Sequence, residues 1–220
     1  MSVSVIDNSF LNTDDCLYLK EKITYLQPYW QQTDNIGSFN FLPLGMYTCN
    51  RSQYVESVTQ YRQLMLDNFE FVYVKLIDKL QSLLNIEIIE NKQLHLPGFH
   101  ISTIKGMHST NFHCDKFVYL KTFTNAYDSH QNVSFKHKLR DPDILSIIIP
   151  IALPKYGAGL LYYEESVLKE LTYTNGIIAT WPGSIVHSIK PYTIENEFDL
   201  RITMQCHLVK IAENKACLFW

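Results

Sequence analysis

Residues 1–92 carry apolar positions at roughly helical spacing. Thr13 or Asp14 can cap a first helix, which continues to about residue 26. A longer run over 52–85 repeats an apolar residue every three or four positions, which is the stripe of an amphipathic helix. We interpret this stripe as core packing, because its side chains do not resemble a set of metal or cofactor ligands.

From about residue 93 the pattern changes to short β-rich runs separated by turn residues. The turn signals "TNG" (174–176) and "PG" (182–183) lie between consecutive runs. Eight short strands in succession are typical of a β-sandwich or a jelly-roll barrel. The predicted strands cover residues 98–104, 112–123, 144–152, 158–165, 168–174, 176–181, 184–192 and 200–211.

The predicted fold class is therefore mainly β, with a helical N-terminal part packed against the outside of a barrel. No internal repeat, low-complexity tract or clear linker divides the sequence, so we expect a single domain over 1–220. Within it, residues 1–92 form a mostly helical support, 93–211 the barrel core and 212–220 a C-terminal tail.

Composition and charge narrow the class of protein. A hydrophobic content of 46% and a charged content of 19% are typical of a globular protein. The net charge of -3 argues against a nucleic-acid partner. Five cysteines without a CxxC pair fit free thiols in a reducing compartment. The sequence shows no signal peptide, and its longest apolar stretch, 144–153, is too short to span a membrane. We expect a cytoplasmic protein that does not bind a membrane. The sequence does not predict its oligomeric state.

The segment "NFHCDKF" (111–117) places His113 and Asp115 two residues apart, on the same face of a strand. Inside a barrel, a carboxylate is costly unless a metal or a cation compensates it. His187, in the later run "WPGSIVHSIKPY", adds a second imidazole. Two histidines and one carboxylate make the facial triad that holds Fe(II) and leaves coordination positions open. The alternative is a surface strand with polar residues facing water.

The last predicted strand has one polar face. Arg201 on this face can grip a carboxylate through two parallel hydrogen bonds, and the Thr203 hydroxyl can add another. Lys190 and Lys210 are alternative ligands if the strand register differs, and a solvated strand face is the alternative to any site. The residues of this face are Arg201, Thr203, Gln205 and His207.

This ordered set, H-x-D, a distant histidine after a "PG" turn, and Arg-x-Thr on the next strand, resembles the Fe(II)/2-oxoglutarate-dependent oxygenase superfamily over roughly residues 93–211. The resemblance implies a double-stranded β-helix, a cupin-like jelly-roll of eight strands braced by N-terminal helices. It also implies that His113, Asp115 and His187 bind iron, and that Arg201 and Thr203 bind the distal carboxylate of 2-oxoglutarate.

One departure from the superfamily pattern is the segment "YTIENEF" (192–198), which places Arg201 further from His187 than in many members. A second 2-oxoglutarate ligand is not evident from the motifs. Tyr119 is our candidate, because it shares the face of the H-x-D pair, and Ser102 and Tyr162 are weaker candidates.

The implied cofactors are Fe(II), 2-oxoglutarate as co-substrate, and O₂, with succinate and CO₂ as by-products. The resemblance further implies that a carboxylate at Asp115 favours hydroxylation, desaturation or a related oxidation, since related halogenases have a small residue there. The expected activity is that of a dioxygenase that hydroxylates a C–H bond of a small polar molecule, such as an amino acid or a natural-product intermediate. A protein or peptide hydroxylase and a cupin-like metalloprotein without 2-oxoglutarate are the alternatives.

A long polar insertion, 124–143, follows the H-x-D strand. It is either a lid over the iron or a surface loop, and Asn125, His137 and Arg140 are its candidate substrate contacts. The remaining histidines are expected on the surface or in loops, and Cys114 is expected to point away from the metal. These remaining histidines are His95, His100, His108, His130 and His137.

Overall fold

The computed structural model describes residues 2–32, 39–45, 48–115, 144–196 and 198–220.

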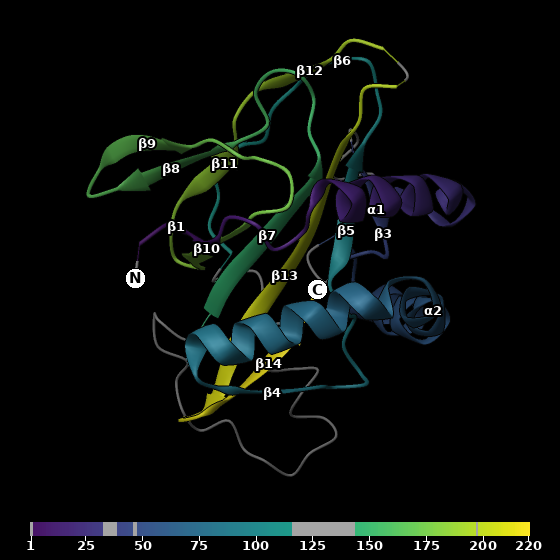
Figure 1. Ribbon diagram of the computed structural model, residues 1–220, viewed down its shortest axis with the longest axis vertical. Helices are drawn as coiled ribbons and strands as arrows, with labels where there is room; N and C mark the ends of the chain where they lie inside the picture. The colour runs from purple at the N-terminus through teal and green to yellow at the C-terminus, as the bar shows by residue number, and fades with distance from the viewer. Residues whose placement is uncertain (1, 33–38, 46–47, 116–143, 197) are drawn as a thin grey trace.

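The centre of the molecule is one large sheet of nine strands, antiparallel except for one parallel pair (Figure 1). Its strands are β1 (Ser4–Asp7), β2 (Gln31–Gln32), β3 (Asn40–Leu42), β4 (Glu87–Ile89), β5 (Gly98–Ser102), β7 (Ile144–Ala152), β10 (Ile178–Pro182), β13 (Arg201–Ala212) and β14 (Lys215–Phe219). The order is β1-β10-β7-β13-β5-β3-β2, and β14 joins β13 to β4. β13 therefore lies at the middle of the sheet, between β7 and β5.

Two smaller sheets complete the β part. One has the order β11-β8-β9, and the other pairs β12 with β6. Their strands are β6 (Gly106–His108), β8 (Leu160–Glu164), β9 (Val167–Leu171), β11 (His187–Ile189) and β12 (Tyr192–Ile194). The strand predicted over 184–192 thus divides in two around Pro191, which has no N–H to donate to a ladder. In the described part of the predicted strand 112–123, only His113 pairs, with His187.

Both predicted helices are confirmed, as α1 (Thr13–Tyr25) and α2 (Arg51–Leu84). The N-cap of α1 is Asn12 and not the predicted Thr13 or Asp14. The Asn12 side chain accepts a hydrogen bond from the backbone N–H of Asp15, and the Asp15 carboxylate accepts one from the backbone N–H of Asn12. α2 ends at Leu84, because the next residue, Asn85, adopts a left-handed backbone that stops the helix. None of the described helices is long and apolar enough to cross a membrane.

α1 and α2 cross the same face of the large sheet (Figure 1), and a single core joins them to β5, β7 and β13. Alternate residues of β13, such as Met204, pack into this core, so the residues between them point to the other face. On that other face, the ring of Tyr192 from β12 lies 5.5 Å from the guanidinium carbon of Arg201. The polar face of β13 is therefore in the interior, between two β layers, and the solvated alternative is wrong.

The predicted helical support, 1–92, and the predicted tail, 212–220, both contain strands that were not expected there. The helical support contains β1 to β4, which extend the large sheet, and a short 3-10 helix, Gln27–Tyr29. The predicted tail, 212–220, instead contains β14, because its residues pair with β13 and β4. The pairing with β13 is a hairpin that turns directly after Ala212, whereas β4 is far from β14 in sequence, and a pairing of that kind leaves no local signal in the tail itself. That the chain is one domain stays a prediction.

The C-terminal residue Trp220 is fully buried and contacts residues from the first quarter of the chain. Its indole N–H donates to the Pro43 carbonyl at 3.0 Å, and its own carbonyl accepts from the Tyr54 hydroxyl at 2.9 Å. We expect Trp220→Ala to lower the free energy of unfolding by about 3–5 kcal/mol, because it leaves a cavity and an unmade hydrogen bond. Urea unfolding measures this change. Phe198→Ala, at a 78% exposed site, is the control, and an equal loss in both variants would contradict the prediction.

Three of the histidines expected on the surface or in loops are in fact buried. His100 and His108 lie in β5 and β6, so the expectation is wrong for both, and His95 lies in a loop but is buried. Each is close to an aromatic ring from another segment, a contact that the local sequence does not reveal. His130, like His137, lies outside the described residues.

Burial lowers the pKa of His95 from its ordinary 6.5 to about 3. Between these two values the unfolded chain takes up a proton that the folded chain does not, so stability is full above pH 6.5 and falls as the pH falls towards 3. For this one group we expect a loss of about 2 kcal/mol between pH 7 and pH 5. Between pH 7 and pH 5, the free energy of unfolding of His95→Gln should fall by about 2 kcal/mol less than that of the wild type. Equal losses would show that His95 is not the cause.

Candidate functional site

The site begins where two distant segments meet. His113 and His187, the first residue of β11, exchange backbone hydrogen bonds of 2.9 and 2.8 Å. This pairing brings their rings to a centroid distance of 4.4 Å. Asp115 follows His113 by two residues and is 6% exposed, so its carboxylate lies in the interior beside both rings. The backbone pairing therefore assembles the three side chains that the sequence proposed as metal ligands.

The ligand atoms of His113, Asp115 and His187 all lie within 4.8 Å of one another. Nε2 of His113 is 3.9 Å from Oδ1 of Asp115, and Nε2 of His187 is 3.8 Å from its Oδ2. These separations are too long for direct hydrogen bonds. They leave the three side chains converging on one point, where a single cation can contact all of them.

The protonation of both imidazoles suits a metal. Nδ1 of His113 is 2.9 Å from the Asn111 carbonyl, and Nδ1 of His187 is 2.9 Å from the Ile185 carbonyl. A carbonyl only accepts, so each Nδ1 carries a proton and each Nε2 presents its lone pair towards Asp115. Metal-binding histidines are held by such hydrogen bonds on the other ring nitrogen. The donor set therefore fits a bound metal ion.

Burial and charge set the ionisation of these groups. Burial lowers the pKa of His187, although the Asp115 carboxylate opposes this effect. Burial by itself raises the pKa of Asp115, but His187, His207 and the hydrogen bond from Ser146 outweigh it, and the net pKa is lowered. At neutral pH the cluster thus holds one carboxylate and neutral His187, which is a ligand set ready for a divalent cation.

A second polar site surrounds Arg201, which is fully buried in β13. Its Nη1 donates to the Thr203 hydroxyl at 3.4 Å, while Nε and Nη2 have no hydrogen-bond partner in the described part of the chain. Burial lowers the pKa of this guanidinium. A charged group in the interior is costly without a counter-charge. The arrangement fits an anionic ligand that accepts from these free N–H groups.

Three further side chains border Arg201. Ser102 lies opposite it in the pairing of β13 with β5, and Tyr192 lies over it from β12. The hydroxyl groups of both are buried, and the two side chains lie close to each other. Tyr173 is also buried and interacts electrostatically with both Arg201 and Asp115, while burial raises its pKa. Tyr173 thus lies within electrostatic reach of both the anion pocket and the metal cluster.

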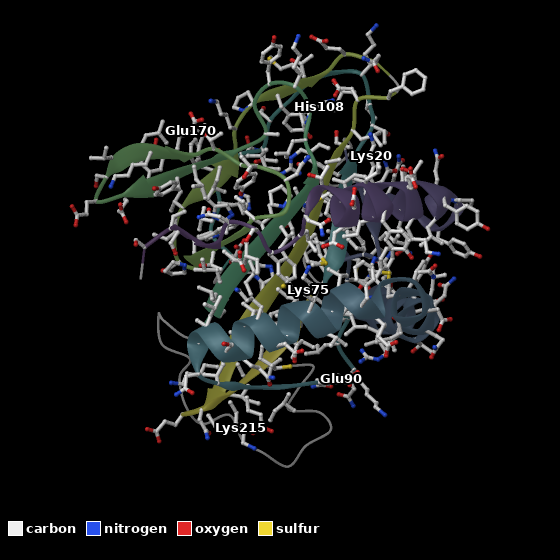
Figure 2. The ribbon with its side chains drawn as sticks, in the orientation of Figure 1. Lys20, Lys75, Glu90, His108, Glu170 and Lys215 are labelled. Atoms are coloured by element: carbon white, nitrogen blue, oxygen red, sulfur yellow. The ribbon has the colours of Figure 1, made fainter. Side chains whose placement is uncertain are left out.

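The other residues that the sequence suggested as ligands lie in different parts of the structure. Lys190 forms an ion pair at 2.6 Å with Glu170, which lies on the β8-β9 hairpin (Figure 2). Lys210 is exposed, so neither lysine borders the buried pocket. Tyr162 pairs with His187 across β8 and β11, and Cys114 is half-buried. The candidates that lie outside the described residues are Tyr119, Asn125, His137 and Arg140.

The sequence did not identify Tyr173 and Tyr192. Tyr192 belongs to the segment 192–198, which lengthens the chain between His187 and Arg201. That segment forms β12, which pairs with β6 and carries Tyr192 back over Arg201. The additional residues therefore place Tyr192 beside Arg201, and the unusual length of the segment was the signal in the sequence.

Among the comparisons with known proteins, the one with solved structures shows similarity, and it concerns the fold. No family model matches the sequence, and no curated protein matches it. Among solved structures, a prolyl-4-hydroxylase from Pseudomonas putida is 13% identical, with a TM-score of 0.50 over 93% of this chain and 90% of its own. An oxidoreductase of the 2OG-Fe(II) oxygenase family from Burkholderia pseudomallei is 8% identical, with a TM-score of 0.51 over 93% and 82%.

A third structure, AviO1 from Streptomyces viridochromogenes, is 10% identical, with a TM-score of 0.51 over 96% of this chain and 90% of its own. At such low identities the likeness concerns the path of the chain. It confirms the predicted fold class, a mainly β barrel with helices packed on its outside. The chain therefore shares the fold of the 2OG-Fe(II) oxygenase from B. pseudomallei and the prolyl-4-hydroxylase from P. putida.

Proposed function

We propose that the chain is an Fe(II)- and 2-oxoglutarate-dependent dioxygenase that hydroxylates a C–H bond of a small polar molecule, such as an amino acid or a natural-product intermediate. One observation carries the proposal. The buried guanidinium of Arg201 has two N–H-bearing nitrogens without a partner among the described residues, and Tyr173 interacts electrostatically both with it and with Asp115 of the cluster of two histidines and one carboxylate. An anion pocket beside such a triad is what a carboxylate co-substrate on Fe(II) requires.

His113, Asp115 and His187 would hold the iron through Nε2, a carboxylate oxygen and Nε2. When bound, the iron supplies oxygen activation with 2-oxoglutarate as the reductant. The protein contributes the charges and the shape. Asp115 provides the negative charge, and the carbonyls behind the two rings fix their orientation. With three ligands from the protein, the iron would keep coordination positions for the co-substrate and O₂.

Arg201 would bind the distal carboxylate of 2-oxoglutarate by a paired hydrogen bond, in a site without competing solvent. Thr203 lies beside it at 3.4 Å, and its hydroxyl can donate to the same carboxylate. The phenol of Tyr192 and the hydroxyl of Ser102 border the pocket and are further donors. The Arg201 charge, costly by itself, would thus be compensated only when the co-substrate is bound.

A protein or peptide hydroxylase is the second candidate. It is favoured by the P. putida neighbour, whose name is prolyl-4-hydroxylase. A cupin-like metalloprotein without 2-oxoglutarate gains no support, since Arg201 faces the interior and would there remain without an anion. We also propose a cytoplasmic location, which the five free cysteines support.

Succinate release tests the function and the substrate class together. The Fe(II)-loaded chain is incubated with 2-oxoglutarate and air, with pools of amino acids or with proline-containing peptides. We expect the amino-acid pool to stimulate succinate release and to yield a product heavier by one oxygen atom. Stimulation by peptides alone would favour the second candidate. Intact 2-oxoglutarate in every pool would overturn the oxygenase proposal.

A further inference from the structure

His207 belongs to the polar face of β13, but it lies outside both the Arg201 pocket and the metal cluster. It is 5% exposed and lies directly opposite Ser146 in the pairing of β13 with β7. Its Nδ1 is 3.2 Å from the Ser146 hydroxyl oxygen. A buried imidazole and a buried hydroxyl at this distance form a hydrogen bond whose purpose the two sites do not explain.

Ser146 connects His207 to the metal cluster. Its hydroxyl is 2.5 Å from Oδ2 of Asp115, and all three side chains are buried. A hydroxyl has a single proton, and an ionised carboxylate only accepts. Ser146 therefore donates its proton to Asp115 and accepts the N–H of His207. The three groups form a chain with a fixed direction, from His207 through Ser146 to Asp115.

This chain acts on one oxygen of the carboxylate. Oδ2 of Asp115 receives the Ser146 hydrogen bond and lies 3.8 Å from Nε2 of His187, while Oδ1 faces Nε2 of His113 at 3.9 Å. With Oδ2 held by Ser146, the carboxylate cannot rotate freely about its terminal bond. Each carboxylate oxygen therefore stays directed towards one of the two imidazoles, and both oxygens keep a lone pair that can bind a cation.

We propose that Ser146 and His207 are positioning residues that hold the Asp115 carboxylate in the orientation in which it binds the metal together with His113 and His187. The inference rests on the proposed function only in taking Asp115 as a metal ligand. His207 acts through Ser146, because its Nδ1–H fixes the hydroxyl oxygen and thereby directs the hydroxyl proton to Asp115. Outer groups of this kind set metal affinity by about 10- to 100-fold.

The chain contains a matched control for this arrangement. Ser57 and His95 form a second buried serine–histidine pair, with 3.0 Å between the hydroxyl oxygen and Nε2. This pair joins α2 to the segment before β5 and makes no contact with Asp115 in the described residues. Ser57→Ala removes the same group from a similar environment, so it reports the cost of losing a buried serine hydroxyl alone.

Mn(II) alone is the probe, and its dissociation constant is measured by electron paramagnetic resonance. We expect Ser146→Ala to weaken Mn(II) binding about 10- to 100-fold, and Ser57→Ala to leave it unchanged. His207→Asn should bind Mn(II) like the wild type, because its side-chain amide N–H takes the place of Nδ1–H. His207→Gln, which places its amide at the position of Nε2, should bind Mn(II) about as weakly as Ser146→Ala.

A second readout separates positioning from general stability. The visible spectrum of bound Co(II) should change in Ser146→Ala, because its coordination changes when the carboxylate is released, and it should not change in Ser57→Ala. Wild-type Mn(II) affinity in Ser146→Ala would overturn the proposal. If Ser146→Ala does not fold, equal affinities of His207→Asn and His207→Gln would overturn it. A wild-type chain that binds no Mn(II) would overturn both this inference and the proposed iron site.

Discussion

Replacing Asp115 with alanine is expected to abolish metal binding and with it any turnover of 2-oxoglutarate. Asp115 is the only carboxylate in the described metal cluster, and it lies between both Nε2 atoms. Without it, two neutral imidazoles would face a divalent cation without a compensating charge. Since outer groups alone change metal affinity about 10- to 100-fold, loss of this ligand should weaken Mn(II) binding by at least about 100-fold. Titration with Mn(II) and succinate release measure the two effects.

Cys114→Ala is the control for this prediction, because it changes the residue between the two ligands. The half-buried Cys114 side chain is not part of the metal cluster in the described residues. We expect this variant to bind Mn(II) and release succinate like the wild type. Wild-type Mn(II) affinity in Asp115→Ala would show that the cluster of His113, Asp115 and His187 is not the metal site.

Arg201→Met should separate co-substrate binding from metal binding. Removing one partner of a buried, hydrogen-bonded charge pair costs about 2–5 kcal/mol, which corresponds to a roughly 30- to 4,000-fold weaker affinity for 2-oxoglutarate. Mn(II) affinity should remain that of the wild type. Because the guanidinium is buried with two N–H-bearing nitrogens unmatched in the described chain, the ligand-free variant should be at least as stable as the wild type.

Thermal unfolding with and without 2-oxoglutarate checks both parts, since a ligand that binds only the folded state raises the melting temperature. The wild type loaded with Mn(II) should be stabilised by 2-oxoglutarate, and Arg201→Met should not be at the same concentration. Arg201→Lys keeps the charge but loses the paired geometry, so its stabilisation should be intermediate. Equal stabilisation of wild type and Arg201→Met would place the co-substrate elsewhere.

The alternation of β13 was predictable from the sequence because side chains in a strand alternate between its faces. It placed Arg201, Thr203 and His207 on one side, and the structure shows that side facing the interior. The direction of the H-x-D pair followed from the same rule. Asp115 is buried as expected, although in the described residues only His113 pairs with another strand. Local periodicity therefore predicted most of the residues of the candidate site.

Other parts of the site depend on contacts between distant segments. Tyr192 reaches Arg201 only because β12 pairs with β6, and Ser146 meets His207 only through the register of β7 on β13. The C-terminal residues read as a tail, yet β14 pairs with the distant β4, and Trp220 packs against Pro43 and Tyr54. Such pairings depend on the tertiary fold, and the residues themselves carry no periodic signal for them.

The central claim is that one site holds Fe(II) on His113, Asp115 and His187 and 2-oxoglutarate on Arg201. Anaerobic titration of the Fe(II)-loaded chain with 2-oxoglutarate tests it most directly, because the chelated co-substrate gives a weak visible charge-transfer band. We expect this band in the wild type, its absence in Asp115→Ala, and its appearance only at much higher 2-oxoglutarate concentrations in Arg201→Met. A wild-type chain that binds Fe(II) but develops no band on addition of 2-oxoglutarate would contradict the claim.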